Sequence, residues 1–224
     1  MVQMITLDTV LTSDAIAAIA EGAKLTLSDK ARQRIRDARA IVDALVDQGI
    51  RGYGINTGVG ALCDVVIDRE EQASLSRNLL FSHSCGVGEP LGRIETRAIM
   101  AAQIANFAHG YSGIRLEVVE TLIALLNKDM LPVIPSRGSV GYLTHGAAIG
   151  LVLIGAGECR HGGKLLSGAD ALAALGRKPL VLQAKEGLSL INGTPCATGL
   201  ASLAVSRLAH LVEWADASAA MSYE

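Results

Sequence analysis

The side chains best suited to chemistry in this sequence stand in or beside four glycine-rich or turn-rich breaks between apolar segments. One polar or ionisable residue marks each break: Tyr53, His83, Ser139 and Asn192. Such loops often carry reactive groups on strained backbone, and tyrosine and histidine can transfer protons at a reacting centre. Taken singly, several of these residues also have a structural interpretation, as a packed tyrosine, a helix-capping histidine or an ordinary Asn-Gly turn.

Familiar ligand-binding motifs are absent from these breaks. The run 52–60 holds four glycines but no GxGxxG, and no GxxxxGK[ST] occurs in the chain, so nucleotide binding has little support. The five histidines include no i, i+4 pair and no HExxH, which argues against a metal site. GxSxG is absent as well, so an α/β-hydrolase serine is unsupported.

Apolar residues at helical spacing predict a mainly α fold, in which the breaks are the connections between helices. Ser13-Asp14 and Ser28 are candidate helix caps, and Gly49 is a candidate stop. A strand or turn is expected over 164–168. The expected helices cover 13–22, 28–49, 68–83, 94–109, 116–128, 143–154, 170–175 and 194 almost to 224.

Composition narrows the class of protein. Half of the 224 residues are hydrophobic but only 3% are aromatic, which favours closely packed helices. The net charge of −2 gives no basic face for nucleic acid. The apolar stretch 146–157 is too short to span a bilayer, and the start shows no secretory signal. Four scattered cysteines without a CxxC pair indicate free, mostly buried thiols, so we expect a cytoplasmic protein.

Five segments, taken together and in order, resemble the aromatic amino-acid ammonia-lyases, which act on histidine, phenylalanine and tyrosine, and the related aminomutases. The matching segments are 53–58 (YGINTG), 82–88 (SHSCGVG), 135–141 (PSRGSVG), 152–155 (VLIG) and 185–194 (KEGLSLINGT). The resemblance covers nearly all of this chain but only about half of a typical member. The pair Ser82-His83 is similar to the histidine-specific branch, whereas phenylalanine enzymes place apolar residues there.

The resemblance implies a helical-bundle homotetramer with a small amino-acid substrate. Its electrophile, 4-methylideneimidazol-5-one, forms from the protein's own Ala-Ser-Gly, so no external cofactor is needed. Tyr53 matches the catalytic base, Ser82 and His83 match the pair that reads the substrate ring, and Asn192 matches a contact of the electrophile or the carboxylate. Gly141 and Tyr142 would flank the electrophile.

The tripeptide itself is not in the sequence. Family members run from Gly-Ser-Val-Gly into Ala-Ser-Gly, but here Gly141 is followed directly by Tyr142, and the spacing to 152–155 is three residues short. We expect a tripeptide that has already cyclised into one modified residue, which the standard letters omit. The alternative is a genuine deletion. Tyr142 also replaces the family's usual aspartate, His145 its proline, and Pro195 the usual glutamine.

The sequence thus predicts an ammonia-lyase that converts L-histidine into urocanate. The alternatives are a tyrosine ammonia-lyase or an aminomutase. If the deletion is genuine, an electrophile-free lyase acting on a trimethylammonium betaine or an inactive assembly subunit becomes the alternative. Residues 1–224 are expected to form the N-terminal catalytic-loop region. The last helix, 194–224, would continue into a C-terminal helical part, without which the chain is expected to be inactive.

Overall fold

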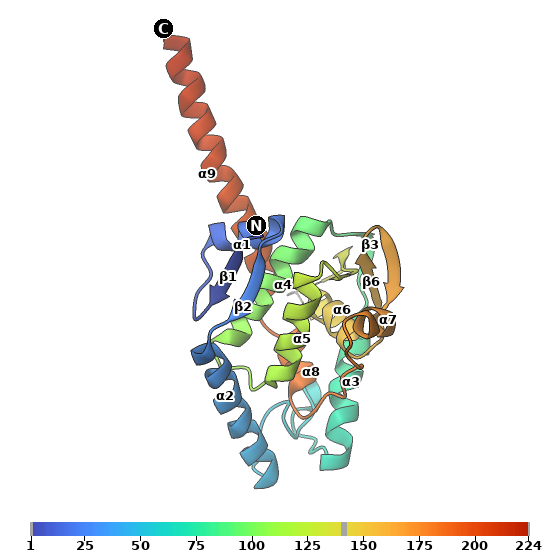
Figure 1. Cartoon of the computed structure of the whole chain (residues 1–224). Helices are drawn as coiled ribbons and strands as arrows, with labels where there is room; N and C mark the ends of the chain where they lie inside the picture. Colours follow the sequence, from blue (N-terminus) through green and yellow to red (C-terminus); the bar gives the residue numbers. More distant parts are fainter. Residues whose placement is uncertain (1, 140–142, 224) are drawn as a thin grey trace.

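Helix α4 (Arg93–Ala108) runs through the centre of the fold and packs against α1 (Ser13–Glu21), α5 (Leu116–Asn127) and the first turns of α9 (Pro195–Tyr223) (Figure 1). Residues 96–104 of α4 are all buried, including the polar side chains of Thr96, Arg97 and Gln103. A helix that is buried all round is the expected centre of a helical domain. The predicted mainly α class is therefore confirmed.

The computed structural model describes residues 2–139 and 143–223. The predicted helices are present, most of them within one or two residues of the expected ends. The remaining helices are α2 (Asp29–Asp47), α3 (Gln72–His83), α6 (Leu143–Leu153), α7 (Gly168–Ala174) and α8 (Glu186–Ile191). The strands are β1 (Met4–Leu7), β2 (Lys24–Leu27), β3 (Val87–Pro90), β4 (Leu131–Pro132), β5 (Pro135–Arg137), β6 (Glu158–His161) and β7 (Lys164–Ser167).

Side-chain caps fix where several helices begin. The Ser28 hydroxyl accepts a hydrogen bond from the Ala31 amide at 3.0 Å, as predicted for α2. For α1 the predicted cap was wrong by one residue: Thr12, not Ser13, accepts from the Ala15 amide. Thr12 takes this role because its backbone is extended while Ser13 is already helical.

The predicted break over 185–194 is only partly a loop. Residues 186–191 form the short helix α8, which packs beside α3 and α6. Close contact with α6 depends on Gly146, where an added Cβ would lie 2.5 Å from the Leu190 carbonyl oxygen. The absence of a side chain at Gly146 thus permits the close packing of α6 against α8.

Three small sheets tie distant segments together. β1 pairs with β2 in parallel, β3 pairs with β5 antiparallel, and β4, β6 and β7 form an antiparallel sheet. Of these strands only β7 coincides with a predicted strand or turn. The β3–β5 pair joins the second glycine-rich break to the third.

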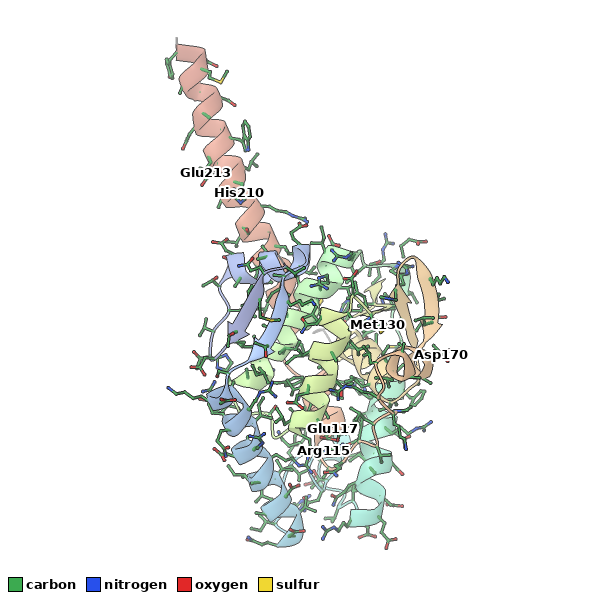
Figure 2. The ribbon with its side chains drawn as sticks, viewed as in Figure 1. Arg115, Glu117, Met130, Asp170, His210 and Glu213 are labelled. Carbon is green, nitrogen blue, oxygen red and sulfur yellow. The ribbon has the colours of Figure 1, made fainter. Side chains whose placement is uncertain are left out.

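The far part of α9 projects from the rest of the molecule (Figure 1), and Figure 2 shows His210 and Glu213 on this projecting part. Its buried residues end at Ser206, and residues 207–223 are exposed, including Leu211 and Trp214. By length and composition, the helical stretch 186–223 could cross a membrane, but 44% of its apolar window is buried in the fold. A core helix meets the same criterion.

All four cysteines are free, as predicted. Cys159 and Cys196 are buried, whereas Cys63 is half-buried and Cys85 is exposed. The prediction of mostly buried thiols therefore holds for two of the four. Burial raises the pKa of the Cys159 thiol to about 11, which keeps it protonated and unreactive.

Candidate active site

Two of the predicted site residues, Tyr53 and Asn192, lie on the wall of one pocket of about 350 Å³. Tyr53 comes from the first glycine-rich loop, and Asn192 from the end of α8. Asn106 of α4, Ser112 of the α4–α5 connection and Lys185 complete the polar part of the wall. A concave site with a few convergent polar groups is the usual form of a small-molecule site.

The loop that carries Tyr53 is folded by hydrogen bonds from its own side chains. Asn56 accepts from the Gly52 amide at 2.8 Å through Oδ1 and donates to the Ile50 carbonyl at 3.0 Å. The Tyr53 hydroxyl oxygen accepts from the Gly60 amide at 3.0 Å. Tyr53 itself is 55% exposed. The phenol oxygen is therefore held by one backbone donor, on a side chain that lines the pocket.

Gly54 explains how this loop approaches α8. Its φ of 62° lies in the left-handed region that favours glycine. A Cβ at this position would collide with the side chain of Leu188. This close approach places the neighbouring Tyr53 near α8, where it lines the same pocket as Asn192.

Lys185 and Asn192 flank α8, one before its first residue and one after its last. Lys185 has a φ of 70°, which is uncommon for a residue other than glycine. Its ammonium group donates to the Ser112 carbonyl oxygen, which also accepts from the Ser189 hydroxyl at 2.8 Å. These two bonds attach α8 to the α4–α5 connection.

A buried ion cluster lies behind Lys185. Glu186 is 0% exposed and forms a bidentate salt bridge with Arg115, in which both N–O distances are 2.8 Å. The Glu186 carboxylate also accepts from the backbone amides of Arg115 and Gln183. Hydrogen bonding to Glu186 raises the pKa of Arg115, against the effect of burial. Figure 2 shows Arg115 and its exposed partner Glu117 at the start of α5.

Ser82 and His83 do not line the pocket of Tyr53 and Asn192. They lie at the end of α3, where the His83 Nδ1 is 2.9 Å from the Leu79 carbonyl oxygen and the Ser82 hydroxyl donates to the same oxygen at 3.2 Å. Both side chains are thus engaged with their own helix end. This arrangement agrees with a capping histidine, and the ring-reading role of the pair stays a prediction.

The second and third breaks are adjacent in space. Val87 pairs with Arg137 in the β3–β5 sheet, and a Cβ on Gly86 would lie 2.7 Å from Thr144 Cγ2 and 2.9 Å from Pro135 Cβ. The Ser139 hydroxyl is buried without a hydrogen-bond partner among residues 2–139 and 143–223. Gly141 and Tyr142 lie outside the described residues.

His145 stands beside these breaks and was predicted only as a departure from the family pattern. It is buried, and its Nδ1 has no hydrogen-bond partner in the part of the chain that the structure describes. Burial lowers the pKa of His145, although a hydrogen bond to the Pro135 backbone opposes the change. His145 is consequently neutral near pH 7.

Sequence reasoning also missed the role of Lys185 and Ser112 in the pocket wall. Lys185 belongs to the matching segment 185–194, but nothing in that segment indicates where its ammonium group points. Among the described residues no group of three or more His, Cys, Asp or Glu side chains could hold a metal ion. The site residues thus come from four separate chain segments that only the fold brings together.

The chain belongs to the aromatic amino acid lyase family, because the sequence model of that family matches residues 11–224. It is 41% identical over 214 residues to histidine ammonia-lyase of Treponema denticola, which covers 94% of this chain and 42% of that protein. It is 45% identical over 204 residues to histidine ammonia-lyase of Alkaliphilus oremlandii, covering 90% and 40%. The chain thus spans about 40% of the length of these relatives.

Solved structures of an aminomutase and of an ergothioneine-degrading enzyme are similar to this chain in fold. A phenylalanine aminomutase of Pantoea agglomerans has a TM-score of 0.89 at 32% identity, covering 94% of this chain and 41% of that one. The ergothioneine-degrading ergothionase of Treponema denticola also has a TM-score of 0.89, at 28% identity, with coverage of 94% and 43%. The predicted family and fold are confirmed.

Proposed function

We propose that the full-length protein eliminates an amine from a histidine-type amino acid and releases urocanate, with L-histidine as the first substrate. The observation that carries this proposal is the meeting of Tyr53 and Asn192 in one pocket. The similarity to histidine ammonia-lyases supports the choice of an imidazole substrate. Because the chain spans about 40% of those relatives, the activity is proposed for a longer protein.

In this proposal Tyr53 removes the β-proton of the substrate. The Gly60 amide holds the phenol oxygen, so the base is oriented before substrate arrives. The Asn192 amide carries two N–H donors and one carbonyl acceptor, which suits contact with the amino-acid head group. Ser82 and His83 remain the proposed contacts of the substrate ring, which requires them to exchange their present bonds within α3 for bonds to the imidazole.

The candidate substrates differ in the amine that must leave. Loss of ammonia is difficult without an electrophile that takes up the amine, which 4-methylideneimidazol-5-one supplies in the family. The sequence contains no Ala-Ser-Gly, so this group would have to follow Gly141 as a residue that has already cyclised, next to positions that lie outside the described residues. We therefore derive no step through it.

A second candidate is elimination of trimethylamine from the trimethylammonium betaine of histidine. The missing tripeptide favours it, as does the likeness to an ergothioneine-degrading enzyme. Tyr53 would take the β-proton, the C–H electrons would form the double bond, and the C–N bond would break as neutral trimethylamine leaves. Trimethylamine departs from a fixed positive charge, so a base alone is sufficient.

One assay distinguishes the two candidates, because both substrates yield urocanate. The full-length protein is mixed separately with L-histidine and with its trimethyl betaine, and absorbance in the urocanate band is followed. Turnover of either substrate supports the imidazole lyase, and the substrate that reacts identifies the leaving group. No urocanate from either contradicts the proposal. A β-amino acid product from L-histidine would identify an aminomutase instead.

The intact mass of the purified protein tests the electrophile independently of activity. A mass above that of the sequence by a dehydrated Ala-Ser-Gly means that the modified residue follows Gly141. Agreement with the sequence means that the electrophile is absent. L-histidine turnover is expected only in the first case, and betaine turnover is compatible with the second.

A further inference from the structure

A second pocket, of about 220 Å³, lies between the start of α4 and the sheet of β4, β6 and β7. Its wall comes from three places: the first turn of α4, the segment 129–133 that contains β4, and the tip of the β6–β7 hairpin. The described residues on this wall are all different from those that line the pocket of Tyr53 and Asn192. The second pocket is therefore a separate cavity.

The two pockets lie at opposite ends of α4. Gly92, just before this helix, lines the second pocket, and Asn106, near its end, lines the pocket of Tyr53. At about 1.5 Å per residue, the 14 positions between Gly92 and Asn106 span about 21 Å. Figure 2 shows a similar separation along α5, with Arg115 before its start and Met130 after its end. A ligand in the second pocket would therefore lie away from the proposed catalytic residues.

The charged groups of the second pocket leave an excess of positive charge. Asp129 is the described acid on its wall, and the Asp129 carboxylate already bonds Arg93 at 2.8 Å and Arg97 at 2.9 Å. Arg160 is exposed on β6 and pairs with no carboxylate among residues 2–139 and 143–223. Glu95, in the first turn of α4, lies outside the described wall. Because a guanidinium has five N–H donors in a fork that matches a carboxylate, Arg160 favours an oxyanion.

Thr96 supplies a buried polar group in the same pocket. It is 2% exposed, lines the pocket, and lies three residues after Arg93 on the same side of α4. Its amide bonds the Gly92 carbonyl oxygen at 3.0 Å, but its hydroxyl forms no hydrogen bond within the described part of the chain. Buried hydroxyl groups normally have a partner. The Thr96 hydroxyl is therefore available to a ligand in the pocket.

The start of α4 adds backbone donors to this hydroxyl. Among the described residues no side chain caps the helix at Gly92, so the first amides of α4 keep free N–H groups. Such amides, together with the helix dipole, favour a negatively charged group. The helix start and the Thr96 hydroxyl therefore point to the same kind of ligand.

The segment 131–133 makes another part of the wall apolar, through Leu131, Pro132 and Val133. A cavity of about 150 Å³ is sufficient for benzene. A pocket of about 220 Å³ can thus hold a ring or a short branched chain that carries one carboxylate. Inorganic phosphate would leave the apolar part of this wall in contact with water, which is unfavourable.

We propose that the second pocket is a binding site for a small organic carboxylate. Arg160, the Thr96 hydroxyl and the first turn of α4 bind the carboxylate, and the apolar body of the ligand lies on residues 131–133. This site is separate from the proposed catalytic residues and does not depend on the proposed function.

Three small probes test the chemistry of the site. Benzoate has both a charge and an apolar body, benzamide lacks the charge, and inorganic phosphate lacks the apolar body. Binding of each probe to the full-length protein is measured by calorimetry at neutral pH and low salt. We expect benzoate to bind roughly tenfold or more tightly than either of the others. No binding of benzoate, or equal binding of benzamide or phosphate, would overturn the proposal.

Two variants remove the proposed contacts. Arg160→Met removes the guanidinium, and Thr96→Val replaces the hydroxyl with a methyl group of similar size. We expect benzoate to bind roughly tenfold or more weakly to Arg160→Met, and roughly threefold to tenfold more weakly to Thr96→Val. Thermal unfolding checks that each variant is folded. Because Arg160 is exposed, Arg160→Met keeps the test valid if Thr96→Val folds poorly.

Two controls locate the bound benzoate. Lys164→Met removes a charge opposite His161 in the same hairpin but outside the described wall, and should change the affinity by less than about twofold. Asn192→Ala, in the pocket of Tyr53, should leave the affinity unchanged. Equal weakening by Arg160→Met and Lys164→Met would mean that only the general charge of the hairpin acts. Loss of binding in Asn192→Ala alone would place benzoate in the other pocket. Either result overturns the proposed site.

Discussion

Two buried arginine clusters use similar chemistry for different purposes. Arg97, 2% exposed, donates to the carbonyl oxygens of Ile19, Ala23 and Leu126 and to the Asp129 carboxylate. Arg115 instead pairs with the fully buried Glu186. In the first cluster a buried cation donates hydrogen bonds to backbone oxygens, and in the second a buried anion accepts hydrogen bonds from N–H groups.

The elements that each cluster joins explain the difference. Arg97 connects α4 with the end of α1 and the end of α5, so it closes the helical core. Burial lowers the pKa of Arg97, and Asp129 only partly offsets this. Glu186 begins α8, whose two flanking residues, Lys185 and Asn192, line the pocket. Equal burial of charge therefore does not mean equal function: the core cluster supports stability, and the α8 cluster also supports the site.

The largest effect expected is on the reaction itself, from Tyr53→Phe. Removal of the proposed base should lower kcat by about 10²–10⁴-fold, while the loss of one exposed hydrogen bond to Gly60 costs less than about 1 kcal/mol of stability. Steady-state kinetics and urea unfolding measure the two. Tyr111→Phe, on the same pocket wall, is the control and should change kcat by less than about twofold and the free energy of unfolding by less than about 0.5 kcal/mol. Full activity in Tyr53→Phe would remove tyrosine as the base.

Arg97→Met tests the contribution of the core cluster to stability. Removing this guanidinium takes one hydrogen bond from each of three buried carbonyl oxygens and one partner from Asp129, so we expect a loss of about 3–5 kcal/mol in the free energy of unfolding. Urea unfolding at 25 °C measures it. The kcat of the remaining folded protein should be unchanged. A loss of kcat larger than the loss of folded protein would mean that the core cluster also acts on the site.

Glu186→Gln tests the cluster of Arg115 and Glu186 at the start of α8. Glutamine keeps an acceptor for the Arg115 side chain but removes the charge, so a smaller loss of about 2–3 kcal/mol is expected. Unlike Arg97→Met, this variant should also weaken urocanate binding, because α8 loses its fixed start. Glu117→Gln is the matched control, since this exposed partner of Arg115 should contribute less than about 1 kcal/mol. Unchanged urocanate binding in Glu186→Gln would contradict the division of roles.

The smallest effect concerns pH and the core cluster. Burial raises the pKa of Asp129, but hydrogen bonds and charge from Arg93 and Arg97 outweigh it and leave the pKa below its ordinary value. A lowered folded-state pKa gives stability that is present above about pH 4 and is lost as pH falls through the folded pKa. Asp129→Asn should therefore flatten part of the decline in stability below about pH 4. An unchanged acid decline would mean that the Asp129 pairs add little.

The sequence predicted the helices well because apolar periodicity is a local property. The expected 94–109 and 116–128 agree with α4 and α5 within one residue at either end. It missed α8 because six residues with a glycine at the second position give no periodic signal. It missed the β1–β2 pair because its strands, four residues each, are separated by the whole of α1.

The candidate site was predicted as a set of residue types but not as a geometry. Family resemblance pointed to Tyr53 and Asn192, and the fold places both in one pocket. The position of the Lys185 ammonium group follows from its bond to Ser112, and the start of α8 is held by the pair of Glu186 with Arg115; both Ser112 and Arg115 lie about 70 residues earlier in the sequence. Spacing along the chain carries no information on such contacts.

The β3–β5 pair and Gly146 hold the chain on either side of the segment that joins them. Upstream of the missing tripeptide, Arg137 is held by Val87, and downstream, Gly146 is seated against the Leu190 carbonyl oxygen. The described hydrogen bonds of His83 and Asn192 go to Leu79 and Leu188, outside this interval. We therefore expect an Ala-Ser-Gly inserted after Gly141 to leave both residues in place.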